Sequence, residues 1–283
     1  MSRGGTLVGV VHLPPLPGSP RSALSPSEIA RGAVADARAL ADAGFDLVML
    51  ENFGDAPFFA GRVPQVTVSA MTLVAALVRA ELPDVPLGIN VLRNDVDAAL
   101  AIATVVSAAC IRVNVHIGAR VTDQGIIEGR AAETLRTRRS LGADRERDGR
   151  PRVAIWADVD VKHSAALAIR PLEQEAEDLA LRAMADAVLV TGSGTGKSVD
   201  FAKLATVKRA VRDVSVLVAS GATMATLGEI ARSCDGVIVG SALREGGVAG
   251  RGVDRKRAAE FAAAFRAAFA SVDEPAARAR ASD

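Results

Sequence analysis

The stretch TLVGVVHL at residues 6–13, followed by SPSEIARGAVADARALADAG at 25–44 and DLVMLEN at 46–52, indicates the fold class. The first and third segments are short and rich in β-branched residues, which is typical of strands. The second is rich in alanine, opens with Ser-Pro and Glu28, and closes with Gly44, as a capped helix does. Together they predict one β/α unit followed by the strand of the next unit.

Strand-like and helix-like segments alternate in the same way along the rest of the chain. The strand candidates lie at residues 6–13, 46–52, 86–94, 110–116, 152–163, 187–192, 214–221 and 236–243. The helix-like segments that follow them lie at 25–44, 66–82, 95–108, 128–142, 171–185, 201–213, 224–233 and 254–270.

This pattern predicts an α/β protein with a single (β/α)8 barrel, because each strand is followed by a helix. A doubly wound open sheet is the alternative, but that fold gives no reason for eight successive β/α units. We expect the barrel to occupy residues 1–271. The tail at 272–283 is rich in Ala and Arg, and we expect it to be disordered.

Composition narrows the function classes. The chain is 49% hydrophobic and 24% charged, as expected for a globular protein with a large core. Aromatic residues make up only 3% and the net charge is +1, so nucleic acid is not an expected partner. We find no signal peptide and no apolar run long enough for a membrane span. The two cysteines imply no disulfide framework, so we expect a cytoplasmic protein, with a homo-oligomer possible.

Polar residues gather where the predicted strands end, which is the active-site face of a barrel. His12, Glu51 and Asn90 end the first three strands. In the next two strands polar and aliphatic residues alternate, so the polar ones share a face that we expect to point into the barrel. These residues are Arg112, Asn114 and His116 in the fourth strand and Asp158, Asp160 and Lys162 in the fifth; His163 is out of phase with them.

Charges inside a barrel are costly unless they are paired or serve a ligand. We therefore predict catalytic roles in acid–base chemistry for Asp158, Asp160, Lys162 and His116. Substrate-binding roles are predicted for His12, Glu51, Asn90, Arg112, Asn114 and Asp123. A divalent metal ion is a possible cofactor, with Glu51, Asp158 and Asp160 as possible ligands.

Two alternatives stay open for this polar set. The carboxylates could simply neutralise Arg112 and Lys162 in an internal salt-bridge network. Lys162 could instead form a Schiff base, although the adjacent acids are expected to keep it protonated. Asp123 and Glu128 lie after the fourth strand, where they could belong to a lid or cap a helix.

The segment TGSGTGKS at 191–198 resembles a nucleotide-binding loop but fails by count. A Walker A loop would need glycine at Thr191, and a dinucleotide fingerprint would need glycine at Lys197. Similar turns, ASGAT at 219–223 and VGSAL at 239–243, follow the last two strands, where many barrels bind phosphate. The predicted phosphate-binding residues are Gly192, Ser193, Gly194, Thr195, Gly196, Lys197, Ser220, Gly221, Gly240 and Ser241.

Several segments together resemble the BtpA/SgcQ family. They include GVVHLPPLPGSP, ENFGDAPF, IRVNVHIGARVTDQGIIEGRAAETLRTRR, ADVDVKH and GVIVGSALREGG, and they run in order from residue 9 to about 247. The resemblance implies a phosphate-binding type of barrel. Some members are associated with photosystem I biogenesis, while SgcQ-like members accompany sugar uptake and have been labelled nucleotide-hydrolysing proteins.

Three functional hypotheses follow. The first is an isomerase, lyase or hydrolase that acts on a small phosphorylated metabolite, either a sugar phosphate or a nucleotide-derived one. The alternative is a non-enzymatic assembly or regulatory factor that uses the barrel as a scaffold. The third is nucleotide hydrolysis, to which the defective Walker spacing gives little support.

Overall fold

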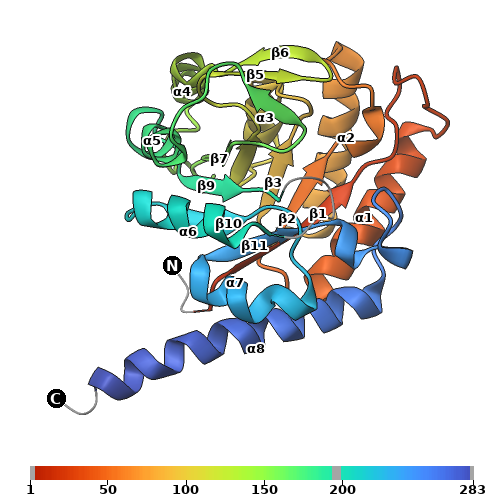
Figure 1. Cartoon of the computed structure of the whole chain (residues 1–283). Helices are drawn as coiled ribbons and strands as arrows, with labels where there is room; N and C mark the ends of the chain where they lie inside the picture. Colours follow the sequence, from red (N-terminus) through yellow and green to blue (C-terminus); the bar gives the residue numbers. More distant parts are fainter. Residues whose placement is uncertain (1–3, 193–198, 281–283) are drawn as a thin grey trace.

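The computed structural model describes residues 4–192 and 199–280 and shows a closed parallel barrel surrounded by helices (Figure 1). The strands pair in the order β1-β11-β10-β9-β7-β4-β3-β2. The predicted (β/α)8 barrel is therefore confirmed, and the open-sheet alternative is wrong. The barrel strands are β1 (Thr6–His12), β2 (Leu47–Glu51), β3 (Leu87–Asn90), β4 (Cys110–Val113), β7 (Ala154–Val159), β9 (Ala187–Val190), β10 (Ser215–Val218) and β11 (Gly236–Val239).

Helices cover the outside of the barrel. Their bounds are α1 (Pro26–Asp42), α2 (Gln65–Glu81), α3 (Val96–Val105), α4 (Ala131–Ser140), α5 (Leu172–Glu177), α6 (Phe201–Ala210), α7 (Leu227–Ser233) and α8 (Arg255–Arg280), with one π-helical turn, η2 (Asp178–Arg182), directly after α5.

The first helix shows how the sequence sets these bounds. Ser25 is the N-cap of α1 and forms a capping box with Glu28: the Glu28 N–H donates to Ser25 Oγ over 3.3 Å, and the Ser25 N–H donates to Glu28 Oε2 over 2.8 Å. The helix ends where Gly44 adopts φ +84°, a conformation that only glycine reaches without steric cost. The residues that α1 buries, Ile29, Ala30, Ala33, Ala37, Ala39 and Leu40, lie almost entirely on one helical face.

The strand alternation divides the core into two layers. Outward-facing residues such as Val11, Leu50 and Ile111 pack against the helices. Inward-facing residues such as Val10, Met49 and Cys110 fill the barrel interior. The interior layers are apolar at the start of the strands and become polar at their ends, so the polar side chains lie at the mouth.

A small antiparallel sheet above the barrel was not predicted. β5 (Ala119–Thr122) pairs with β6 (Gly125–Glu128) and with β8 (Ser164–Ala166), so it joins the loop after β4 to the loop after β7. Figure 1 shows β5 and β6 at the top of the molecule, away from α8. Glu128 therefore ends a strand, and the N-cap residue of α4 is Arg130, without a side-chain cap.

The C-terminal helix packs against α1 and α7. The expected domain boundary at residue 271 lies inside α8 (Figure 1). The division into a barrel and a disordered tail at 272–283 stays a prediction. In the part of the chain that the structure describes, no helix is both long and apolar enough to cross a membrane.

Candidate active site

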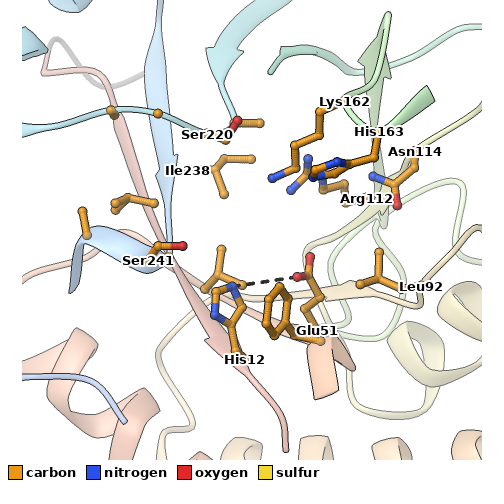
Figure 2. Close-up of a pocket in the computed structure, with 18 of the residues that line it drawn as sticks. His12, Glu51, Leu92, Arg112, Asn114, Lys162, His163, Ser220, Ile238 and Ser241 are labelled. Atoms are coloured by element: carbon orange, nitrogen blue, oxygen red, sulfur yellow. Dashed lines mark ion pairs between the residues drawn. The ribbon is translucent and has the colours of Figure 1, made fainter. Parts of the chain in front are cut away.

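A cavity of about 350 Å³ lies at the mouth of the barrel. Its walls come from the carboxyl ends of β1, β2, β4 and β11 and from the loops after β2, β3, β4, β7, β10 and β11. Figure 2 shows His12 and Glu51 on one side, Arg112, Asn114 and Lys162 on a second, and Ser220 and Ser241 on a third. The barrel therefore brings together residues that lie more than 200 positions apart in the sequence.

Glu51 forms a hydrogen-bonded acid group at the bottom of this cavity. Its Oε2 accepts a hydrogen bond from Asn90 Nδ2 over 2.6 Å, and its Oε1 lies 3.9 Å from His12 Nε2. The His12 ring stacks on Phe53 with 4.3 Å between the ring centroids. Burial outweighs the nearby Glu51 charge and lowers the pKa of His12 to about 4, so His12 is neutral at pH 7.

Asp158 holds two residues of the cavity wall in place. It accepts bonds from Arg112 Nε over 3.0 Å and from Arg112 Nη2 over 2.9 Å, and a third from Asn114 Nδ2 over 2.6 Å. The Arg112 and Asp158 side chains are 6% and 0% exposed. Arg112 and Asn114 line the cavity, whereas Asp158 lies behind them. The three residues lie in the barrel as the alternation predicted.

Lys162 extends into the cavity from the loop after β7, and its end lies beside Arg112 (Figure 2). Burial, followed by the positive charge of Arg112, lowers the pKa of Lys162 even though Glu51 and Asp158 act in the opposite direction. The acids therefore offset the shift only in part, since one of them is already paired with the arginine, and the expectation that they keep Lys162 protonated stays a prediction.

The predicted phosphate turns form the part of the cavity wall that follows β10 and β11. Ser220, Gly221, Gly240 and Ser241 all line the cavity, and the Gly192 N–H donates to Ser220 Oγ over 3.1 Å. A 3₁₀ turn, η4 (Ser241–Leu243), begins here. The other predicted residues of this group, Ser193, Gly194, Thr195, Gly196 and Lys197, lie outside the described residues.

Gly240 is required by its contact with His12. A Cβ at this position would lie 2.9 Å from both His12 Cε1 and His12 Nε2. Any larger residue would push the imidazole out of its stack on Phe53. The glycine turn and the histidine therefore fit each other.

Asp160 and His116, which were grouped with the site, lie elsewhere. β7 ends at Val159, and Asp160 has φ +44°, which breaks the strand alternation. Its carboxylate pairs with Arg120 and, over 2.8 Å, with Lys203. Burial raises the pKa of Asp160, but these bonds outweigh it and lower the pKa overall. His116 is buried, and its Nε2 donates to the Ala183 carbonyl over 3.1 Å.

Asp123 lies at the rim of the site. It occupies the turn between β5 and β6 and shares a shallow outer pocket with Phe58, Arg93, Gln124 and His163. Its side chain accepts a hydrogen bond from Gln124 and caps no helix. A role for Asp123 would therefore require a ligand that reaches out of the main cavity.

The three possible metal ligands do not converge. Glu51 is bonded to Asn90, Asp158 to Arg112, and Asp160 to Lys203. Among the described residues no group of three or more His, Cys, Asp or Glu side chains could hold a metal ion. These residues therefore do not fit the metal site that we considered.

Sequence reasoning left the aromatic and further cationic or imidazole side chains of the cavity out of the predicted site: Phe53, Phe58, Arg93 and His163. The pair Arg93-Asn94 follows the third strand, which was a signal for the arginine. The aromatic residues carried no such signal, because they lie in the irregular loop after β2. His163 was doubtful because the strand alternation places it on the outer face; its φ of +57° turns it inward.

These features define a (β/α)8-barrel protein with a cavity at its mouth that is lined by both apolar and charged side chains. The profile of the BtpA family matches residues 3–267. The chain belongs to the BtpA family.

Two relatives support this assignment. The uncharacterized protein PH1209 of Pyrococcus horikoshii is 44% identical over 90% of this chain and 94% of its own length. The photosystem I biogenesis protein BtpA of Synechocystis is 41% identical over 90% of this chain and 86% of its own length.

Solved structures with much lower identity share the fold. Phosphoribosyl anthranilate isomerase from Thermus thermophilus is 13% identical, with a TM-score of 0.53 over 94% of this chain and 99% of its own. At this identity the similarity describes the barrel alone.

Proposed function

We propose that this protein is an enzyme that binds a small phosphorylated metabolite at the barrel mouth and acts on it by acid–base chemistry. One observation carries the proposal. The cavity has glycine and serine turns on one wall and the Glu51–His12 pair on another. An anionic group and a reacting centre could thus be held at the same time.

Charge and hydrogen-bond donors favour an anion at the turns. Leu243 N donates to Gly240 O and Arg244 N to Ser241 O, so the N–H groups of Ser241 and Ala242 have no partner within the turn. Such N–H groups are the usual phosphate ligands in barrels. Because Asp158 neutralises Arg112, the described residues of the cavity lining keep two further cations, Arg93 and Lys162 when the lysine is protonated, and one acid, Glu51.

Glu51 is the acid–base group that the geometry favours. It faces the cavity, whereas Asp158 lies behind Arg112 and Asp160 points away from the mouth. Neutral His12 can hold a substrate oxygen or pass a proton. We therefore give Asp158 a positioning role: it orients Arg112 and Asn114 toward the substrate.

A thermal-shift screen tests the proposal. We expect inorganic phosphate and at least one phosphorylated metabolite to raise the melting temperature, while its dephosphorylated form does not. A ligand at one hundred times its Kd stabilises the folded state by about 2.7 kcal/mol. If no phosphorylated compound and no phosphate stabilises the protein, the proposal fails.

Two variants then separate binding from chemistry. Glu51→Gln should keep the bond from Asn90 and the stabilisation by the ligand, but lose turnover of the compound found in the screen. Ser241→Ala should weaken the stabilisation, whereas Ser233→Ala, half-buried at the end of α7 and outside the cavity, should not. Unchanged turnover in Glu51→Gln would contradict the assigned role.

A second candidate, a non-enzymatic assembly factor, is favoured by exposed apolar side chains on and beside the β6-β5-β8 sheet: Val121, Ile126, Leu167 and Ile169. In that case Ile126→Glu should abolish recovery of a stoichiometric partner in a pull-down, and Glu51→Gln should not. Nucleotide hydrolysis depends on residues 193–198, outside the described residues. It would be tested by ATP turnover with Lys197→Ala as the control.

A further inference from the structure

Lys162 differs from the other described lysines in its surroundings. Lys203 Nζ bonds to Asp160 over 2.8 Å, and Lys208 Nζ bonds to Asp235. Lys256 lies 3.9 Å from Glu260. Within the described residues, Lys162 Nζ has neither a hydrogen bond nor an ion pair, and it extends into the cavity (Figure 2).

The backbone of Lys162 is held on both sides. Its N–H donates to Thr191 Oγ1 over 3.1 Å, and its carbonyl accepts from Arg93 Nη2 over 2.7 Å. Thr191 follows β9 and Arg93 follows β3, so the backbone of the lysine is held from both sides of β7, since β9 and β3 lie on opposite sides of it in the strand order. A group held in this way is directed into the cavity at little entropic cost.

The surroundings also favour the neutral amine. Burial opposes the charged ammonium, and the guanidinium of Arg112 adds to this effect. Since arginine stays protonated in proteins, its charge lowers the pKa of the lysine, while Glu51 and Asp158 oppose this effect only in part. A lysine desolvated beside another cation is an activated nucleophile.

We infer that Lys162 attacks a carbonyl carbon of the substrate and forms an imine with it, so the substrate class is a phosphorylated aldehyde or ketone. This inference rests on the proposed function for the phosphate group and extends it to the reacting group. A cavity of about 350 Å³ between Lys162 and the glycine turns leaves room for a short phosphorylated carbon chain.

The step balances with no further reactant. The lone pair of Nζ forms a bond to the carbonyl carbon, and the carbonyl oxygen takes one of the two protons that the nitrogen loses, which gives a neutral carbinolamine. The nitrogen lone pair then forms the C=N bond while the C–O bond breaks, and the oxygen takes the second amine proton and leaves as water. Glu51, on the same cavity, is placed to accept the proton from nitrogen and return it to the departing oxygen. The imine then withdraws electrons from the neighbouring carbon, as an isomerase or lyase requires.

Pyridoxal 5′-phosphate is a suitable probe, because it carries both an aldehyde and a phosphate. The full chain is incubated with it and reduced with borohydride, and peptide mass spectrometry locates the adduct. An ordinary lysine is about 0.1% neutral amine near pH 7.4, and each unit of pKa lowering raises this fraction about tenfold. We expect labelling at Lys162 to be at least about tenfold faster than at Lys208.

Two variants and one second probe complete the experiment. Lys162→Arg keeps a cation but removes the nucleophile, and should lose the adduct. The matched variant Lys203→Arg can keep its ion pair with Asp160 and should still be labelled at Lys162. Pyridoxal, which lacks the phosphate, should label Lys162 more slowly, and inorganic phosphate should slow labelling by pyridoxal 5′-phosphate.

The outcomes separate the inference from the function on which it rests. Phosphate that stabilises the protein while Lys162 stays unlabelled would overturn the imine and leave phosphate binding intact. Equal labelling by the two aldehydes, with no effect of phosphate, would support the imine lysine and overturn the phosphate site. Labelling only at other lysines, without stabilisation by phosphate, would overturn both.

Discussion

Replacing Asp158 by asparagine removes the negative charge that neutralises Arg112 while keeping the size of the side chain. Both partners are almost fully buried, at 6% and 0% exposure. Oδ2 accepts from Arg112 and Asn114, and Oδ1 accepts from Arg112. In Asp158→Asn the amide nitrogen takes one of these positions and faces a donor, so at least one hydrogen bond is lost.

The expected cost follows from this geometry. Removing one partner of a buried ion pair typically costs about 3 to 5 kcal/mol, because the remaining charge is left uncompensated. Here the remaining guanidinium also lies beside Lys162. Total stabilities are about 5 to 15 kcal/mol, so the variant should fold but unfold at a clearly lower urea concentration.

Urea denaturation of the purified protein measures this cost. The control is Asp42→Asn, which breaks the exposed Arg255–Asp42 pair, 63% and 58% exposed, and should cost no more than about 1 kcal/mol. A double variant, Arg112→Met with Asp158→Leu, should recover much of the loss, because no charge is then buried alone. If Asp158→Asn loses no more than the control, the reasoning about this pair is refuted.

Three further predictions concern single residues. Burial lowers the pKa of His12 to about 4, so between pH 4 and 6.5 the unfolded state binds more protons than the folded state. The contribution of His12 to stability is therefore complete above pH 6.5 and is lost toward pH 4, at up to about 1.4 kcal/mol per pH unit. In denaturation curves measured across this pH range, His12→Gln should flatten that slope. Gly240→Ala should lower the free energy of unfolding by about 1 to 3 kcal/mol, because the new Cβ meets His12. The control Gly228→Ala has open space around it in α7 and should raise the free energy of unfolding by up to about 1 kcal/mol. Equal effects of the two variants on the melting temperature would contradict this. Ser25→Ala removes the cap of α1 and should cost about 1 kcal/mol of unfolding free energy, with no change in phosphate binding.

The barrel and much of its polar mouth could be predicted because strand alternation is local. His12, Glu51 and Arg112 occupy inward positions on strands whose apolar neighbours leave no other arrangement. The same rule failed where the strand stopped. Asp160 was assigned inward by continuing the alternation past Val159, and a positive φ at a non-glycine residue leaves no clear mark in a sequence.

The small sheet could not be predicted for a different reason. β5 and β6 are only four residues each, and β5 also pairs with β8 more than 40 residues further along the chain. Pairing over such a distance depends on where the barrel places the two loops, and the sequence of neither segment alone indicates that position. The surroundings of Lys162 could not be predicted for the same reason, because Arg112, which lowers the pKa of the lysine, comes from another strand.

The pairing of β5 with β8 also limits how the protein can be changed by evolution or design. In many barrels each mouth loop can be exchanged alone, since only its two strand ends fix it. Here a graft that replaces the loop after β4 would remove the partner of β8 and expose its unpaired backbone groups, which invites aggregation. Loop libraries aimed at new substrates should therefore exchange both loops as one unit, and homologous sequences should vary the two segments together.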